Sequence, residues 1–230
     1  TMATKKQKEA AEKAAEEKTA QEAEEQAQEN AALEMLLEAS AKEPVDNRLI
    51  ALFGDIDEVK AGQLCYNLFH LAADKRYAAK NPDDLTEGLE EVVDPIQLMI
   101  CSPGGNASEM FAIYDCMRLV RESCPIHTLG MGKVMSAGVL VLAAGTKGKR
   151  KIGRNCRVMI HSVIGGVSGG LHNVENEIDE IRWVQDQYIK MLADESDLSR
   201  AQLKKMLQRK VNIYLSAEQA VEHGIADIIV

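Results

Sequence analysis

Short apolar runs alternate with amphipathic stretches along most of the chain, from residue 48 to residue 195. The apolar runs predict buried strands, and the amphipathic stretches between them predict helices. The predicted strands cover residues 48–54, 96–101, 126–131 and 158–161. The predicted helices cover residues 59–75, 108–122, 136–144 and 173–195. This alternation is typical of an α/β domain in which helices cover a sheet.

Two polar segments interrupt this pattern. Residues 1–44 are dominated by Ala, Glu, Gln and Lys, with few large apolar side chains before Leu33. They are expected to form a charged N-terminal arm, helical or disordered, and an arm that pairs with a partner protein is the functional alternative. Residues 76–94 are also polar and are expected to be a surface insertion. The rest of the chain, residues 45–230, is expected to fold as one domain.

Composition and charge argue against several classes of protein. The net charge of −9 argues against nucleic acid as a partner, because that binding depends on neutralising phosphates. The five cysteines never occur as a Cys-x-x-Cys pair, so neither a disulfide framework nor a zinc site is expected. The sequence has no apolar run long enough to cross a membrane and no apolar core of a secretion signal. We therefore expect a cytoplasmic protein without metal, cofactor or membrane contact.

The candidate chemistry lies between residues 130 and 161. Ser136 stands among small residues where a turn enters a predicted helix, which leaves room for a sharp backbone and for a substrate. Its hydroxyl is therefore a candidate nucleophile, and His161, which closes the last predicted strand, is its candidate base. Lys133, three residues before the serine, is the alternative base of a Ser–Lys dyad.

A pair of glycines, Gly104 and Gly105, lies between a predicted strand and a predicted helix. As a turn, the pair needs only the positive φ that glycine adopts freely. As part of a site, the amide of Gly105 is a candidate donor to a developing oxyanion, and the amide of Ala137 is the second donor. Together with Ser136 and His161, these amides would supply a nucleophile, a base and an oxyanion hole.

Several motifs in this order resemble the proteolytic subunit of the Clp protease, the ClpP family of serine peptidases. The motifs are Ser-Pro-Gly-Gly at 102–105, the surroundings of Ser136 through Gly145, Lys-Gly-Lys-Arg at 147–150, Met-Ile-His at 159–161 and the closing segment at 214–227. The resemblance covers roughly residues 49–230. It implies a ClpP/crotonase-like α/β fold of repeated strand-strand-helix units and a peptidase domain over residues 45–230.

The resemblance implies that Ser136 is the nucleophile, that His161 is the base, and that the amides of Gly105 and Ala137 form the oxyanion hole. The family's third triad residue is an aspartate, and the corresponding position here is Asn212. An asparagine oxygen can orient the imidazole but brings no charge to stabilise the imidazolium. Since the same change lowers turnover about 10⁴-fold in a chymotrypsin-type triad, a slow or conditionally active peptidase is expected.

The resemblance also implies a handle over residues 163–195, made of a glycine-rich strand and the long predicted helix. In the family the handle joins two rings, and its strand receives the substrate by β-augmentation. Gly165 and Gly166, together with Gly104, are therefore expected to contact substrate. Where the family has a proline after its histidine, this chain has Val163, whose N–H can form a hydrogen bond that proline cannot.

Stacked heptameric rings that form a tetradecameric chamber are the assembly implied by the resemblance, so we expect a homo-oligomer that acts on polypeptides. A Clp-type ATPase unfoldase is the implied partner. In the family it docks in apolar pockets lined by aromatic residues, and the corresponding positions here are Gln97, Met99 and Leu119. We therefore expect a weaker docking surface than in the family.

Three functions stay open at this point. The first is a serine endopeptidase that cleaves unfolded proteins or peptides through a Ser136 acyl-enzyme, with His161 as base and Asn212 as orienting residue. The second is a weakly active or non-catalytic ClpP-like subunit of a mixed ring. The third is a phage-type capsid-processing protease of the same superfamily, in which the arm binds a structural partner.

Overall fold

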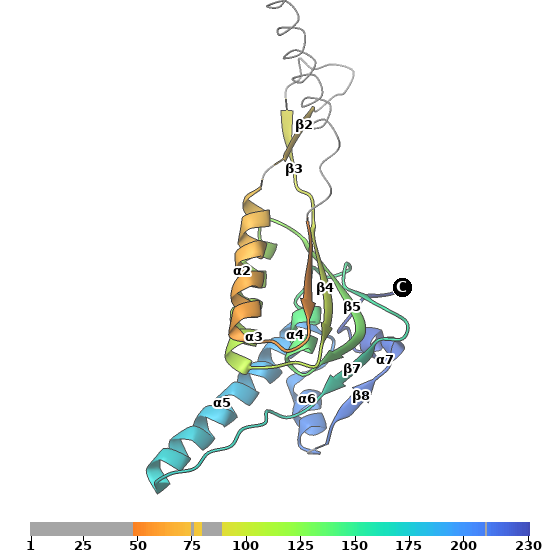
Figure 1. The fold of residues 1–230 in the computed structure, drawn as a ribbon. Helices are drawn as coiled ribbons and strands as arrows, with labels where there is room; N and C mark the ends of the chain where they lie inside the picture. The colour runs from red at the N-terminus through yellow and green to blue at the C-terminus, as the bar shows by residue number, and fades with distance from the viewer. Residues whose placement is uncertain (1–47, 75, 80–88, 210) are drawn as a thin grey trace, which may run out of the picture. The chain divides into compact units, whose positions relative to one another are not determined.

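The computed structural model describes residues 48–74, 76–79, 89–209 and 211–230. All of these residues belong to one unit, Arg48–Val230 (Figure 1). The expected N-terminal arm, residues 1–44, lies outside the described residues. Within them, strands and helices are interspersed from β1 to β9 and most neighbouring strands of the central sheet are parallel, so the α/β class predicted from the sequence is confirmed.

The predicted strands and helices correspond to eight of the elements in Figure 1. The strands are β1 (Leu49–Phe53), β2 (Arg76–Ala79), β3 (Leu89–Val92), β4 (Ile96–Ser102), β5 (Ile126–Met135), β6 (Lys151–Ile152), β7 (Arg157–Ile160), β8 (Ile213–Leu215) and β9 (Ile228–Ile229). The helices are α2 (Glu58–Ala73), α3 (Ala107–Arg121), α4 (Ala137–Ala143), α5 (Leu171–Glu195), α6 (Arg200–Leu207) and α7 (Ala217–Glu222). Among these described helices, none combines the length and the apolar character that a membrane crossing requires.

The central sheet has seven strands, and its path divides at β5. β1, β4 and β5 lie side by side and are parallel. The first half of β5 also pairs in parallel with β6, and β6 pairs in parallel with β9. The second half of β5 pairs instead with β7, whose other neighbour, β8, is antiparallel. The division falls at Gly132, whose φ of +62° lets the strand bend. As a result, the end of β5 that leads into Ser136 lies beside the end of β7 that leads into His161.

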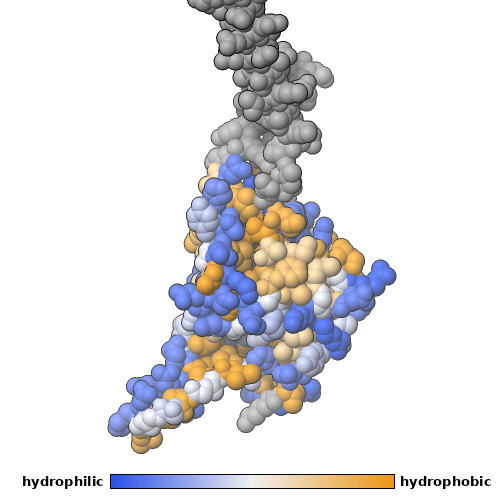
Figure 2. All heavy atoms as spheres, in the orientation of Figure 1, coloured by the Kyte–Doolittle hydropathy of each residue, from blue (hydrophilic) through white to orange (hydrophobic). Residues whose placement is uncertain are grey.

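The core lies around β4 and the short helix α4. Alternate residues of β4 are fully buried, and all seven residues of α4 are buried. The expectation that the first strand is buried is wrong, because within β1 Leu52 alone is buried. Among the described strands β1 pairs with β4 only, so it lies at the sheet edge and leaves Leu49 and Phe53 56% and 50% exposed. Figure 2 shows apolar side chains gathered on the face where β1 runs.

Side-chain caps set the beginnings of α2 and α3. Asp57 caps α2 and Asn106 caps α3, and each side-chain oxygen accepts a backbone N–H of the first turn at 2.9 Å. The two helices pack against each other (Figure 1). Asp57 directly follows Ile56, and Asn106 directly follows Gly105. The caps therefore fix the points at which these two loop residues lead into their helices.

Shorter elements were not predicted from the sequence pattern. Residues 76–94, expected to be a surface insertion, contain the antiparallel pair β2–β3, in which Arg76 lies opposite Val92. β6, β8 and β9 have two or three residues each, which is too short for a periodic pattern. α6 and α7 both begin with a capping box, at Ser199 and Ser216, which is a usable sequence signal.

The glycine-rich segment before α5 differs from the expectation. A strand was expected around Gly165 and Gly166, but residues 161–168 have no regular secondary structure. A strand needs a neighbour to complete its ladder, and no strand of the described chain pairs with this segment. The expected helix is confirmed, since α5 runs from Leu171 to Glu195 (Figure 1).

Two ion pairs tie the C-terminal part of the chain to α4. Arg121 binds the carboxylate of Glu195 through two hydrogen bonds of 2.7 and 3.0 Å. Arg150 binds the carboxylate of Asp227 through two side-chain bonds of 2.6 and 2.9 Å. Both arginines also donate to carbonyls at the end of α4, at 2.7 and 3.1 Å. The helix that begins at Ser136 is therefore anchored at its other end by charge-assisted hydrogen bonds.

Candidate active site

Ser136 lies at a sharp turn between β5 and α4. Its backbone has φ +53° and ψ −122°, and it is the one non-glycine residue of the described chain with positive φ. Such a conformation costs about 1–3 kcal/mol and persists only where the surroundings hold it. The Ser136 N–H donates to the carbonyl of Met159 at 2.8 Å, and the Ser136 carbonyl accepts from the amide of Val139 at 3.0 Å. Its hydroxyl makes no capping bond to α4, which leaves it available as a nucleophile.

Gly104 packs directly against the serine. A Cβ at this position would lie 2.6 Å from Ser136 Cβ and 2.9 Å from the carbonyl of Met135. Its φ of +102° also favours glycine, and its N–H donates to the hydroxyl of Ser102 at 3.0 Å. Gly104 was expected to contact substrate, and the structure places it against Ser136 but not among the residues that line the adjacent pocket.

The backbone amide of Gly105 points away from the neighbouring segment at Ile56. A parallel bridge joins Gly105 to Ile56, in which Ile56 N donates to Gly104 O at 2.8 Å and Ile56 O accepts from Asn106 N at 3.0 Å. In a parallel bridge these bonds use the residues on either side of Gly105, so its own N–H points to the opposite side. Gly105 lines the pocket, and its amide is therefore placed to act as an oxyanion donor.

A pocket of about 530 Å³ brings the two candidate donors and the candidate nucleophile together. Ala137 is the first residue of α4, so its N–H has no acceptor within the helix. The residue is 4% exposed. The lining consists of Pro103, Gly105, Asn106, Ala107, Met110, Ser136, Ala137, His161, Val163, Ile164 and Tyr188. The structure thus gathers the two glycine- and serine-containing turns and the end of β7 around one cavity.

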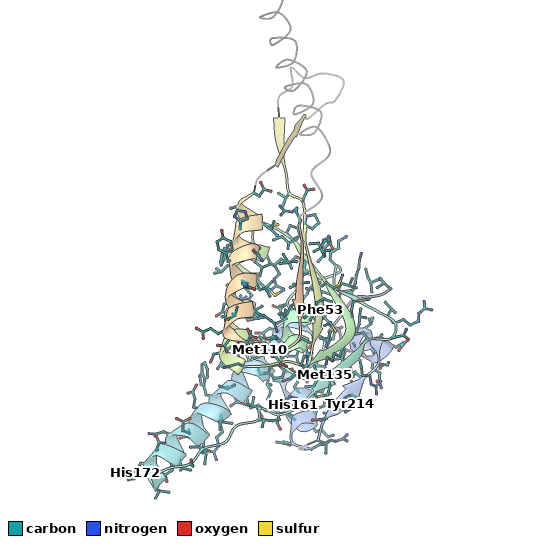
Figure 3. All side chains as sticks on the ribbon, in the orientation of Figure 1. Phe53, Met110, Met135, His161, His172 and Tyr214 are labelled. Carbon is teal, nitrogen blue, oxygen red and sulfur yellow. The ribbon has the colours of Figure 1, made fainter. Side chains whose placement is uncertain are left out.

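His161 follows β7 and lines the same pocket as Ser136. Its Nδ1 lies 2.6 Å from the carbonyl oxygen of Ser162. A carbonyl only accepts, so the proton of the neutral ring sits on Nδ1 and Nε2 keeps its lone pair, as a general base requires. The described contacts include no hydrogen bond between the ring and the Ser136 hydroxyl. Figure 3 shows His161 in the same region as Met110 of the pocket lining, whereas His172 lies far away at the tip of α5.

Asn212 lies immediately before β8 and is exposed. β7 and β8 place Ile160 opposite Ile213, so the register extended by one residue brings Asn212 opposite His161. Among the described contacts, however, none joins the Asn212 side chain to the imidazole, and Nδ1 contacts Ser162 instead. The structure therefore brings the two backbones together without a triad hydrogen bond.

Other candidates lie outside the pocket lining. The exposed Lys133 is on β5 opposite Arg157, so a Ser–Lys dyad has no support from the geometry. Gly165 packs against α5, since a Cβ there would lie 2.6 Å from Ile181 Cδ1, and Gly166 has open space around it. Their neighbours Val163 and Ile164 line the pocket instead.

Met110 and Tyr188 also line the pocket, although neither was expected there from the sequence. Both are almost fully buried, and Tyr188 donates its hydroxyl to the carbonyl of Ser136 at 3.3 Å. Burial raises the pKa of Tyr188, so this hydroxyl stays protonated at neutral pH. Met110 lies in the first turn of the helix that the Gly104–Gly105 turn opens, which is a signal that could have identified it.

The structure also places the positions expected to dock an ATPase. Gln97 and Met99 both lie on the half-buried face of β4, and Gln97 Nε2 lies 3.3 Å from His127 Nδ1. Leu119 of α3 is 59% exposed. Among the described residues, no group of three or more His, Cys, Asp or Glu side chains is arranged to hold a metal ion.

Comparison with known proteins agrees with the fold and with the motifs. The family model for Clp protease matches residues 86–230. The ATP-dependent Clp protease proteolytic subunit 1 of Rhodopirellula baltica is 31% identical over 183 residues, which cover 80% of this chain and 72% of that protein. The family model spans the turns at Gly104–Gly105 and Ser136 and also His161, and the two matches show that the chain belongs to the Clp protease family.

Proposed function

We propose that this chain is a Clp-type serine endopeptidase that hydrolyses peptide bonds of unfolded proteins or peptides. The observation that carries the proposal is the single pocket lined by Ser136, His161, Gly105 and Ala137. Gly105, the adjacent pair Ser136 and Ala137, and His161 come from three separate segments of the chain, and together they would supply a nucleophile, a base and two backbone donors. Family membership supports a serine peptidase in general, and the pocket supports these particular residues.

In the proposed mechanism, the Ser136 hydroxyl oxygen attacks the scissile carbonyl while Nε2 of His161 takes its proton. The amides of Gly105 and Ala137 donate to the oxygen that becomes negative, and the protonated His161 then gives its proton to the leaving amine. A water molecule repeats the sequence on the acyl-enzyme and releases the second product. The positive φ of Ser136 contributes by turning the hydroxyl out of α4 and into the pocket.

Asn212 is proposed as an orienting residue, with its amide oxygen as one acceptor for the Nδ1 proton of His161. It supplies no negative charge, so the imidazolium is stabilised less than in an aspartate-containing triad. The contact between His161 and Ser162 favours a second candidate function, a weakly active or non-catalytic subunit of a mixed ring. In that case the pocket would keep its shape, but proton transfer through His161 would be slow.

The same proposal includes assembly into stacked heptameric rings, a peptidase domain over residues 45–230 and a separate arm over residues 1–44. The exposed apolar side chains of β1 and α5 support contacts between copies, since Leu49, Phe53 and Trp183 are each at least half exposed. The segment at 161–168, which lacks a strand partner, supports substrate binding by β-augmentation. A Clp-type ATPase is proposed as partner because the named relative is ATP-dependent.

Covalent labelling with a fluorophosphonate and cleavage of a fluorogenic peptide test the proposal. We expect the wild type to be labelled, Ser136→Ala to lose labelling and cleavage, and the neighbouring control Ser162→Ala to keep both. A carboxylate about 4 Å from the imidazole in a solvated site is worth about 1–3 kcal/mol, so Asn212→Asp should raise kcat by a factor of roughly 5 to 160. If the wild type is not labelled and Asn212→Asp gains nothing, the non-catalytic subunit is the better function. Native mass spectrometry tests the assembly, and a stable monomer or dimer would contradict the rings.

A further inference from the structure

Two hydrogen bonds connect α5 to the candidate active site. The hydroxyl of Tyr188 donates to the carbonyl of Ser136 at 3.3 Å, and the amide of Val163 donates to Oε1 of Gln185 at 3.1 Å. Gln185 and Tyr188 are three residues apart, so they lie one above the other on the same side of the helix. One face of α5 therefore contacts both the turn of the nucleophile and the segment that follows the base.

The peptide group between Ser162 and Val163 links Gln185 to His161. Its N–H donates to Gln185 Oε1, and its carbonyl oxygen lies 2.6 Å from His161 Nδ1. A peptide group is planar and rigid, so a bond that holds the N–H also fixes the direction of the C=O. The imidazole, the peptide and the glutamine amide therefore form one continuous series of hydrogen bonds.

Hydrogen bonds in series strengthen one another, because each polarises the next group. The bond from the Val163 amide to Gln185 makes the Ser162 carbonyl a better acceptor for the Nδ1 proton of His161. This acceptor is neutral, so it orients the ring and selects the tautomer but stabilises the imidazolium less than a carboxylate would. The arrangement also depends on Val163, because a proline at that position would have no N–H to donate.

We propose that Gln185 is a positioning residue for His161, which acts through the Ser162–Val163 peptide to hold the carbonyl that orients the imidazole. This inference rests on the proposed function, in which His161 activates Ser136. It identifies what supports the base in a chain whose third triad position carries asparagine. Gln185 does not line the pocket, so its effect on turnover passes through His161 rather than through contact with substrate.

The test uses the full chain and measures kcat, KM and the rate of fluorophosphonate labelling at Ser136. Gln185→Leu removes the acceptor and is expected to lower kcat and the labelling rate roughly threefold to tenfold, the effect of one hydrogen bond, with KM unchanged. Gln185→Glu keeps an acceptor oxygen and should restore the wild-type rate. Gln187→Leu is the matched control, because among the described contacts its side chain makes no hydrogen bond; it should keep the wild-type kcat.

A second variant removes the other partner of the same bond. Val163→Pro should lower kcat by the same factor as Gln185→Leu, and the double variant should lose no more than either single variant. If the losses of Gln185→Leu and Val163→Pro multiply in the double variant, the proposal is overturned. A wild-type kcat in Gln185→Leu, or a raised KM at constant kcat in that variant, would also overturn it. Equal losses in Gln185→Leu and Gln187→Leu would show a general effect on α5 and would also overturn it. A wild type that is not labelled at all would instead overturn the proposed function, on which the inference depends.

Discussion

Replacing Gly105 by alanine is the most direct test of the proposed oxyanion hole. A Cβ at this position would lie 2.6 Å from the backbone nitrogen of Ile56 and closer still to its carbonyl oxygen. Both atoms belong to the backbone, so no side-chain rotation can relieve the overlap. Either the Gly105 segment or the turn at Ile56 must therefore move by an appreciable fraction of an ångström.

The movement has a calculable cost for catalysis. An oxyanion donor works at about 2.7–3.1 Å, and the loss of one donor lowers kcat by about 10²–10³-fold, or ~2.7–4 kcal/mol. We expect Gly105→Ala to lower kcat by this factor while KM for a short peptide changes little. The hydrogen bonds that hold Ser136 and His161 do not involve Gly105. The same overlap should lower the free energy of unfolding by about 1–3 kcal/mol.

The assay is steady-state cleavage of a fluorogenic peptide, with urea denaturation and native mass spectrometry to confirm that the variant is folded and assembled. Gly62→Ala on α2 is the matched control, because a Cβ there meets no atom within 4 Å. It should keep the wild-type kcat. A folded and assembled Gly105→Ala protein with a kcat close to that of the wild type would refute the assignment of this amide to the oxyanion hole.

Two further predictions concern Lys133 and Asp227. Lys133→Ala is expected to leave kcat unchanged, because the side chain is exposed and outside the pocket; a loss as large as that of Ser136→Ala in the peptide assay would restore the Ser–Lys dyad. Burial raises the pKa of Asp227, but hydrogen bonds and the charge of Arg150 outweigh burial and leave the pKa below its ordinary value of 3.8. The ion pair therefore stabilises the fold fully above that value and loses its contribution as the pH falls through the lowered pKa. Urea midpoints measured from about pH 7 to about pH 3 should fall more steeply for the wild type than for Asp227→Asn, and equal slopes would contradict this account.

The main candidate residues could be singled out from the sequence because each stands at a junction with its own local signal. Ser136 lies among small residues at a helix start, His161 ends an apolar run, and Gly105 belongs to a glycine pair between a strand and a helix. The structure brings all three to one pocket. Asn212 was identified only through the resemblance to a family, because an asparagine before a three-residue strand produces no signal of its own.

Two expectations failed because they depended on neighbours that a linear pattern does not reveal. β1 has the apolar composition of a buried strand, yet its place at the sheet edge leaves Leu49 and Phe53 half exposed. The segment around Gly165 has the composition expected of the handle strand, yet it forms no ladder because no described strand lies beside it. In both cases the neighbouring segments, and not the local composition, decided the structure.

By itself, the sequence determined the α/β class and the order of its longer elements, and it singled out Ser136 and His161 as the candidate nucleophile and base. These features depend on periodicity and on small residues at turns, which are patterns among a few neighbouring residues. Only the tertiary structure decided which segments meet: the division of β5 that sets Ser136 beside the end of β7, the bridge from Ile56 that turns the Gly105 amide, and the bond from Gln185 that fixes the peptide beside His161. These are hydrogen bonds between segments that are far apart in the sequence and meet only in the folded chain. Their geometry depends on how those segments pack, which no local pattern of side chains specifies.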